Sequence, residues 1–136
     1  MSQQIKLPHY PMYIDGEFIT SSKIKLRSIN PHNGKPWATF ANSEPKEIER
    51  AIMAARQSLH QGEWTDMLPT ERGKLLFKLA DLIEEHAALI GEIETNDSGK
   101  LLAETATQTK YVADYYRYFA GLADKIEGAT LPIDKP

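Results

Sequence analysis

The side chains that most often do chemistry in proteins are sparse in this sequence. It contains no cysteine, which excludes a thiolate nucleophile, a disulfide and a thiolate metal site within these residues. The four histidines are His9, His32, His60 and His86. None lies four residues from another histidine or at a metal-ligand spacing from a second ligand. We therefore interpret them as surface or helix-capping residues.

Carboxylates and glycines add little chemistry. Glu84 with Glu85, or Glu92 with Glu94, could form an acid–base pair. Residues one or two apart on a helix do not face each other, however, so a solvated helix face is the better interpretation. Neither GxGxxG nor GxxxxGK followed by Ser or Thr occurs, and these are the patterns that hold phosphates. We expect no catalytic constellation and no phosphate-binding turn here.

An aromatic run could in principle stack on nucleic-acid bases. Its members are Tyr111, Tyr115, Tyr116, Tyr118 and Phe119. The sequence has 16 basic and 19 acidic residues, a formal net charge of −3, whereas nucleic-acid binding needs a concentrated positive surface. Packing in a core or an interface is therefore the better interpretation. No apolar run reaches the ~18 residues of a membrane span, so we expect no nucleic-acid partner, no membrane partner and a cytoplasmic location.

The turn and strand signals divide the chain into an arm (1–12), a strand region (13–41) and a helical region (43–128). Asp15-Gly16 lies between two apolar runs, which predicts a tight hairpin because both residues tolerate positive φ angles. A second hairpin is expected between Ile24 and Ala41, around the turn-forming residues that follow Asn30.

From Ser43 the apolar period changes from two to 3.6, which predicts three amphipathic helices. We expect Ser43 to cap the first helix, Gly91 to mark a bend in the second and Gly128 to end the third. The predicted buried faces are Ile48, Ala51, Ile52, Ala55 and Leu59; Leu75, Leu76, Leu79, Leu82 and Ile83; and Val112, Tyr115, Tyr116, Phe119, Ala123 and Ile126. No Val/Ile run suits a buried parallel strand. The chain is thus interpreted as the helix-rich front part of a larger α/β enzyme.

Several segments, taken in order, resemble the NAD(P)-dependent aldehyde dehydrogenase superfamily from about residue 12 onward. They include Tyr13-Ile14-Asp15-Gly16-Glu17-Phe18, Ile29-Asn30-Pro31-His32-Asn33-Gly34-Lys35, Glu71-Arg72-Gly73-Lys74-Leu75-Leu76, Glu94-Thr95-Asn96-Asp97-Ser98-Gly99-Lys100 and Tyr118-Phe119-Ala120-Gly121. The resemblance implies that residues 1–136 are an incomplete N-terminal portion of the cofactor domain, with the central Rossmann-like sheet outside this chain.

The resemblance also implies a chemistry. Members oxidise an aldehyde to a carboxylic acid through a cysteine thiolate, an oxyanion-binding Asn, a Glu base and NAD or NADP. All of these groups fall beyond the matched segment. We therefore expect the chain alone to be inactive and to bind neither cofactor tightly, and the complete enzyme to be a homo-oligomer.

Two sites are implied by the resemblance alone. A monovalent cation would be held by the backbone carbonyls of Ser28 and Ile29 and by Asp97, since hard cations prefer oxygen ligands; the alternative is that Asp97 only caps a helix end. Tyr111 matches a position that lines the aldehyde tunnel in some members, and the alternative is an ordinary packed aromatic residue.

Other functions stay open. The unfinished stretch Leu131–Pro136 favours a truncated enzyme whose partner is the remainder of the dehydrogenase chain. A second possibility is a non-catalytic interaction module that docks on a full-length relative through its apolar helix faces. The third is an independent helical domain with its own ligand.

Overall fold

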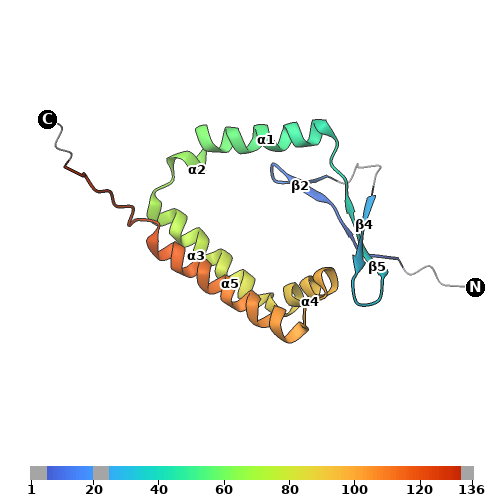
Figure 1. Cartoon of the computed structure of the whole chain (residues 1–136). Helices are drawn as coiled ribbons and strands as arrows, with labels where there is room; N and C mark the ends of the chain where they lie inside the picture. Colours follow the sequence, from blue (N-terminus) through green and yellow to red (C-terminus); the bar gives the residue numbers. More distant parts are fainter. Residues whose placement is uncertain (1–5, 20–24, 133–136) are drawn as a thin grey trace, which may run out of the picture.

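The structure is a computed structural model that describes residues 6–19 and 25–132. Ten elements lie in the described residues, strands first and helices after them (Figure 1). The strands are β1 (His9–Tyr10), β2 (Met12–Ile14), β3 (Glu17–Ile19), β4 (Lys25–Asn30) and β5 (Lys35–Ala41). The helices are α1 (Pro45–His60), α2 (Glu63–Asp66), α3 (Pro69–Glu85), α4 (Ala87–Ser98) and α5 (Leu102–Leu122). The mixed α/β character expected from the sequence is confirmed. Ile24 and the stretch after Pro132 lie outside the described residues.

Both expected hairpins form. β2 and β3 pair antiparallel, and their turn has φ angles of 54° at Asp15 and 77° at Gly16. Positive φ at both turn residues matches the right-handed twist of the flanking strands. β4 and β5 also pair antiparallel. Their turn is closed by the N–H of Gly34, which donates to the carbonyl of Asn30 at 2.8 Å.

The described part of the arm expected over residues 1–12 packs against the sheet as a short strand. β1 pairs in parallel with β5, so that the sheet order is β1-β5-β4. The N–H of Thr39 donates to the carbonyl of Pro8 at 2.9 Å, beside this pairing. Two residues carry too little alternation to signal a strand. Among the described strands, β1 and β5 are the parallel pair, and the two-stranded β2-β3 sheet is separate.

Helix α1 begins differently from the prediction that Ser43 is its cap. The N-cap is Glu44, whose backbone N–H donates to the buried carboxylate of Glu47 at 2.6 Å. This capping box leaves Ser43 free to donate to the sulfur of Met12, and Pro45 occupies the first turn, where its missing N–H is not needed. Gln61 caps the other end, and the short α2, which the sequence did not predict, follows.

The second predicted helix breaks at His86 and not near Gly91. α3 ends at Glu85, His86 leaves the helical conformation with ψ of 13°, and α4 starts at Ala87. Gly99 ends α4 in the left-handed conformation with φ of 77°, which a glycine adopts without steric cost. The last helix, α5, stops at Leu122. The prediction that it continues to Ile126 and ends at Gly128 is therefore wrong.

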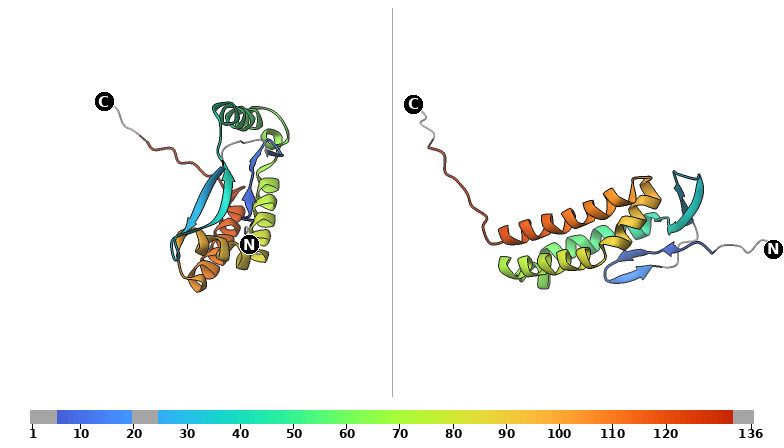
Figure 2. Two further views of the ribbon diagram at one scale, coloured as in Figure 1. Left: turned by 90° about the vertical axis from the view of Figure 1, so that its right-hand side faces the viewer. Right: turned by 90° about the horizontal axis from the view of Figure 1, so that it is seen from below.

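Helices α3, α4 and α5 pack through small residues. α5 lies along α3 and contacts α4 (Figures 1 and 2). The buried residues of the three helices are Gly73, Ala80, Ala87, Gly91, Thr105, Thr109, Ala113 and Ala120. A Cβ built on Gly91 would lie 2.9 Å from the backbone nitrogen of Ala106, and one on Gly73 would lie 2.8 Å from the carbonyl oxygen of Ala120. The backbones thus touch where the glycines lie.

The larger apolar side chains lie outside this small-residue core. Most of the predicted buried faces are exposed, including Ile48, Ile52, Leu59, Leu75, Leu79, Leu82, Tyr115 and Phe119. The 3.6-residue period placed each stripe on one side of its helix but did not identify what covers it. Among the described residues, no helix is long and apolar enough to cross a membrane.

We predict that Gly91→Ala lowers the free energy of unfolding by up to about 2 kcal/mol. Overpacking against a backbone costs ~1–3 kcal/mol, and the higher helix propensity of alanine offsets about 1 kcal/mol of that cost. Urea unfolding followed by far-UV circular dichroism measures the change. Gly121→Ala is the matched control, because its new Cβ meets nothing within 4 Å, and it should leave stability unchanged or raise it. Equal effects of the two variants would contradict the close backbone contact.

Candidate functional site

The first candidate site is a groove between the β4–β5 hairpin and α4. Trp37 Nε1 of β5 donates to Ser28 Oγ of β4 at 2.8 Å, and Ser28 Oγ in turn donates to Asp97 Oδ1 in the last turn of α4. The groove has a volume of about 580 Å³, and Ile29 lies on its wall with these three residues. Residues separated by about seventy positions in the chain, Ser28 and Asp97, are therefore brought into direct contact.

A second polar contact lies in this seam, the region where the β4–β5 hairpin meets α4. Asn30 Nδ2 donates to Asn96 Oδ1 at 3.0 Å, while the N–H of His32 donates to Asn30 Oδ1 at 2.9 Å and orders the turn. The β4–β5 register shifts between Ser28 and Ile29. The residue that this shift leaves without a partner in the ladder is Trp37 of β5, because Ser28 pairs with Ala38 and Ile29 with Pro36.

This seam has the chemistry to hold a hard cation. Its residues offer a carboxylate, a hydroxyl and the backbone carbonyls of β4, which are oxygen donors of the kind that hard cations prefer. Within the described residues no group of three or more His, Cys, Asp or Glu could hold a metal ion, so carbonyl oxygens would have to complete any coordination. Of the three predicted ligands, Ser28 and Asp97 are in contact and Ile29 lines the same groove.

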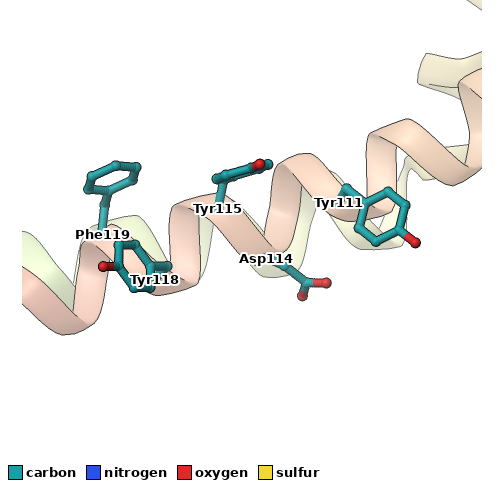
Figure 3. A pocket seen from close by; sticks show the side chains of 5 residues that line it. All are labelled: Tyr111, Asp114, Tyr115, Tyr118 and Phe119. Atoms are coloured by element: carbon teal, nitrogen blue, oxygen red, sulfur yellow. The ribbon is translucent and has the colours of Figure 1, made fainter.

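The second candidate site is an open hollow on the outer face of α5. Figure 3 shows its five lining side chains, which come from that single helix. They are Tyr111, Asp114, Tyr115, Tyr118 and Phe119, and the hollow measures about 360 Å³. Tyr115 is 67% exposed and Phe119 57% exposed. These aromatic residues therefore do not pack in a core of the described chain.

Charge gathers beside this hollow. Arg117 Nη2 donates to Asp81 Oδ1 at 2.9 Å and to Glu84 on α3, and Nη1 donates to Asp114 Oδ1 at 3.2 Å. Hydrogen bonding to Asp81 and then to Glu84 raises the pKa of the Arg117 guanidinium above its ordinary value. Arg117 therefore stays charged and joins α3 to α5, directly behind the aromatic face.

Two contacts of the candidate sites were missed at the sequence level, and one was partly foreseen. Nothing in a strand pattern indicates that the indole of Trp37 bonds Ser28, although a half-buried indole N–H needs an acceptor. Asp114 and Arg117 lie three residues apart, the spacing at which ion pairs form on a helix, and they do pair. Asp81 lies three residues after Lys78 but binds Arg117 of another helix.

The N-termini of α1, α3 and α5 suit the pyrophosphate of a dinucleotide poorly. α1, α3 and α5 carry acidic residues in their first turns, namely Glu47, Glu71 and Glu104. A carboxylate there competes with a phosphate for the same N–H groups and repels its charge. None of these three helices is entered through a glycine turn.

Comparisons with known proteins identify the family of this chain. The family model described as the aldehyde dehydrogenase family matches residues 18–136. The (Z)-2-((N-methylformamido)methylene)-5-hydroxybutyrolactone dehydrogenase of Acinetobacter baylyi is 44% identical over 130 residues, covering 96% of this chain and 26% of that protein.

Two solved structures share the fold. The NAD+ complex of aldehyde dehydrogenase from Bacillus cereus has a TM-score of 0.83 at 35% identity, covering 92% of this chain and 26% of that chain. The NAD-dependent aldehyde dehydrogenase from Sinorhizobium meliloti has a TM-score of 0.86 at 29% identity, covering 91% and 25%.

The chain belongs to the aldehyde dehydrogenase family. It spans about a quarter of the length of the relatives that it matches.

We predict that Ser28→Ala lowers the free energy of unfolding by about 1–3 kcal/mol, because it leaves the Trp37 indole N–H without its acceptor and Asp97 without its donor. Denaturant unfolding monitored by tryptophan emission measures the loss. Ser43→Ala serves as the control: its hydroxyl is exposed and contacts only the sulfur of Met12 among the hydrogen bonds described for it, so a change below about 0.5 kcal/mol is expected. Indistinguishable losses would refute the role of Ser28 in joining the sheet to α4.

Proposed function

We propose that residues 1–136 form the N-terminal portion of the cofactor domain of an enzyme that oxidises an aldehyde to a carboxylic acid with NAD or NADP. The observation that carries the proposal is the ordered match to the family over residues 18–136. The similarity of the fold to aldehyde dehydrogenase structures, at TM-scores of 0.83 and 0.86, supports it.

In this proposal the chain is a scaffold and not the reacting part. The resemblance assigns the reaction to a cysteine thiolate, and this sequence has no cysteine. The helix N-termini described above also suit a phosphate poorly. The chain by itself is therefore proposed to have no dehydrogenase activity and no tight affinity for NAD or NADP.

The groove is proposed to hold a structural monovalent cation in the complete enzyme. Asp97 would supply a carboxylate, and Ser28 and Ile29, which flank the register shift between β4 and β5, would supply backbone carbonyls. A cation there would bind α4 to the sheet more strongly than the Ser28–Asp97 hydrogen bond alone, because one positive charge attracts oxygen dipoles from both elements. Tyr111 is proposed to line the path of the aldehyde, and its exposed position on α5 supports that assignment.

The partner is proposed to be the remainder of a dehydrogenase chain, in an enzyme that assembles as a homo-oligomer. Large apolar side chains on α1, α3 and α5 are exposed, which is typical of surfaces that another polypeptide covers. The same exposure also favours the second candidate function, a non-catalytic module that docks on a full-length relative. In the first candidate function this chain supplies the N-terminal quarter of the enzyme. In the second it binds to a relative that already has its own N-terminal quarter.

A chimera tests the first candidate. Residues 1–136 would replace the matching quarter of the Acinetobacter baylyi relative. We expect the chimera to reduce NAD when an aldehyde is supplied, since its fold and contacts are restored, and the chain alone to give no turnover. Absorbance of the reduced nicotinamide is the measurement. A chimera carrying Gly91→Val is the control and should lose activity together with its fold.

Two results would contradict this proposal. One is a chimera with native helical content and the oligomeric state of its parent that nevertheless lacks activity. The other is turnover by the pure 136-residue chain. Co-purification of the intact chain with an unaltered full-length relative, without loss of the relative's own first quarter, would favour the docking module.

We further predict that K⁺ or Na⁺ raises the unfolding midpoint of the chimera, with Tris chloride used to keep the ionic strength constant. A ligand that binds only the folded state stabilises it by RT ln(1 + [L]/Kd). Asp97→Asn should abolish the cation dependence, whereas Asp124→Asn, which removes a carboxylate that pairs with Lys125 away from the groove, should retain it. A cation dependence that persists in Asp97→Asn would exclude this site.

A further inference from the structure

The turn between β4 and β5 contains an asparagine that is followed directly by a glycine (Figure 1). Residues 31–35 are all exposed. Gly34 has a φ of 66°, a conformation that glycine adopts without steric cost, and a Cβ built on it would meet nothing within 4 Å. The peptide that joins Asn33 to Gly34 therefore lies in a turn open to water, and residue 34 has no side chain to cover it.

The side chain of Asn33 is held over this peptide. Its Oδ1 accepts a hydrogen bond from the backbone N–H of Lys35 at 2.9 Å, the turn in which an asparagine bonds its own backbone two residues on. Because this bond spans Gly34, it keeps the side-chain amide close to the nitrogen of that residue. The bond also stabilises negative charge that develops on Oδ1 when a nucleophile attacks the amide carbon.

One hydrogen bond opposes such an attack without preventing it. The N–H of Gly34 donates to the carbonyl of Asn30 at 2.8 Å, and this bond must break before the nitrogen reacts. In an exposed turn, water takes the place of the carbonyl as acceptor, so the net cost of breaking the bond is small. The Gly34 nitrogen is therefore available as a nucleophile in the folded chain.

The other asparagines of the described residues lack this combination. Asn30 precedes Pro31, whose nitrogen carries no proton. Asn96 lies within α4, where the backbone N–H groups belong to the helical hydrogen-bond pattern. Asn42 precedes Ser43, whose side chain crowds the peptide nitrogen that would have to attack.

We infer that Asn33 is a site of spontaneous deamidation that passes through a succinimide. Solvent base removes the proton of the Gly34 N–H, and the nitrogen attacks Cγ of Asn33. The new C–N bond closes the succinimide ring, the Cγ–Nδ2 bond breaks, and ammonia leaves. Water then opens the ring at either carbonyl, which gives aspartate or isoaspartate. Water is the only co-reactant, and nothing is oxidised or reduced.

The isoaspartate product changes the hairpin where it meets α4. In isoaspartate the main chain runs through the side-chain carbons and gains a methylene group. This extra length falls between Asn30 and Lys35, which are paired across the turn. Asn30 also donates to Asn96 of α4 at 3.0 Å. Deamidation at Asn33 therefore disturbs the same residue that joins the hairpin to the helix.

Ageing of the folded 136-residue chain tests the inference. The chain is kept at mildly alkaline pH, digested at acidic pH to stop further conversion, and mapped by mass spectrometry, with isoaspartate labelled by an isoaspartyl methyltransferase. We expect Asn33 to convert about ten-fold or more faster than Asn42 or Asn96, which corresponds to ~1.4 kcal/mol in activation free energy. This comparison is made within the unaltered chain, so it does not depend on whether a variant folds.

Two variants at this position complete the test. Asn33→Gln is the control for the chemistry and should leave the turn unlabelled, because a glutamine has to close a larger ring. Asn33→Asp supplies the new carboxylate on a normal backbone and should keep the urea midpoint of the parent chain. The aged chain that contains isoaspartate should have a lower midpoint than both.

Conversion of Asn33 no faster than that of Asn42 or Asn96 would overturn the inference, and so would equal labelling of the turn in Asn33→Gln. A midpoint as low in Asn33→Asp as in the aged chain would refute the proposed effect of the longer backbone. None of these measurements uses dehydrogenase activity, so their outcome is independent of the proposed function.

Discussion

The close approach of three helix backbones is the constraint on which the rest of the structure depends. α5 contacts both α3 and α4, and Gly73 and Gly91 lie where its backbone is nearest. Only residues with little or no side chain fit such a contact, which explains why alanine, glycine and threonine occupy the interior of this bundle. Close packing through small residues places the larger side chains on the outer faces, and the aromatic hollow of α5 is a direct result.

A second consequence is that the helices and the strands are nearly separate bodies. The β4–β5 hairpin meets the bundle at α4, and the two-stranded sheet meets α1, where Arg50 Nη2 donates to Glu17 Oε2 at 2.7 Å. The views in Figures 1 and 2 show α1 set apart from the α3–α5 pair. The described part of the chain therefore leaves large apolar side chains exposed on its helices.

Local physics explains how much the sequence could predict. The Asp15-Gly16 hairpin depends on residues within one turn of each other, and it was foreseen. The proline-led start of α3 and the end of α4 at Gly99 are equally local features. The misplaced features depend on distant partners. β1 exists because β5 offers an edge, and the buried side of α5 is set by α3 and α4. For the candidate sites, the family resemblance alone indicated Ser28, Asp97 and Tyr111, whereas the Trp37 bond and the position of Asp114 within an aromatic face required the fold.

The seam between β4 and α4 has a thermal consequence of its own. It contains two hydrogen bonds between side chains, Ser28 to Asp97 and Asn30 to Asn96. Breaking these bonds exposes polar groups, whose hydration lowers the heat capacity, whereas opening an apolar contact raises it. Apolar attraction weakens on cooling, so these two hydrogen bonds should keep their strength in the cold better than the apolar contacts around them. The strength of the contact between the sheet and the helices therefore depends on temperature differently from the strength of the apolar contacts.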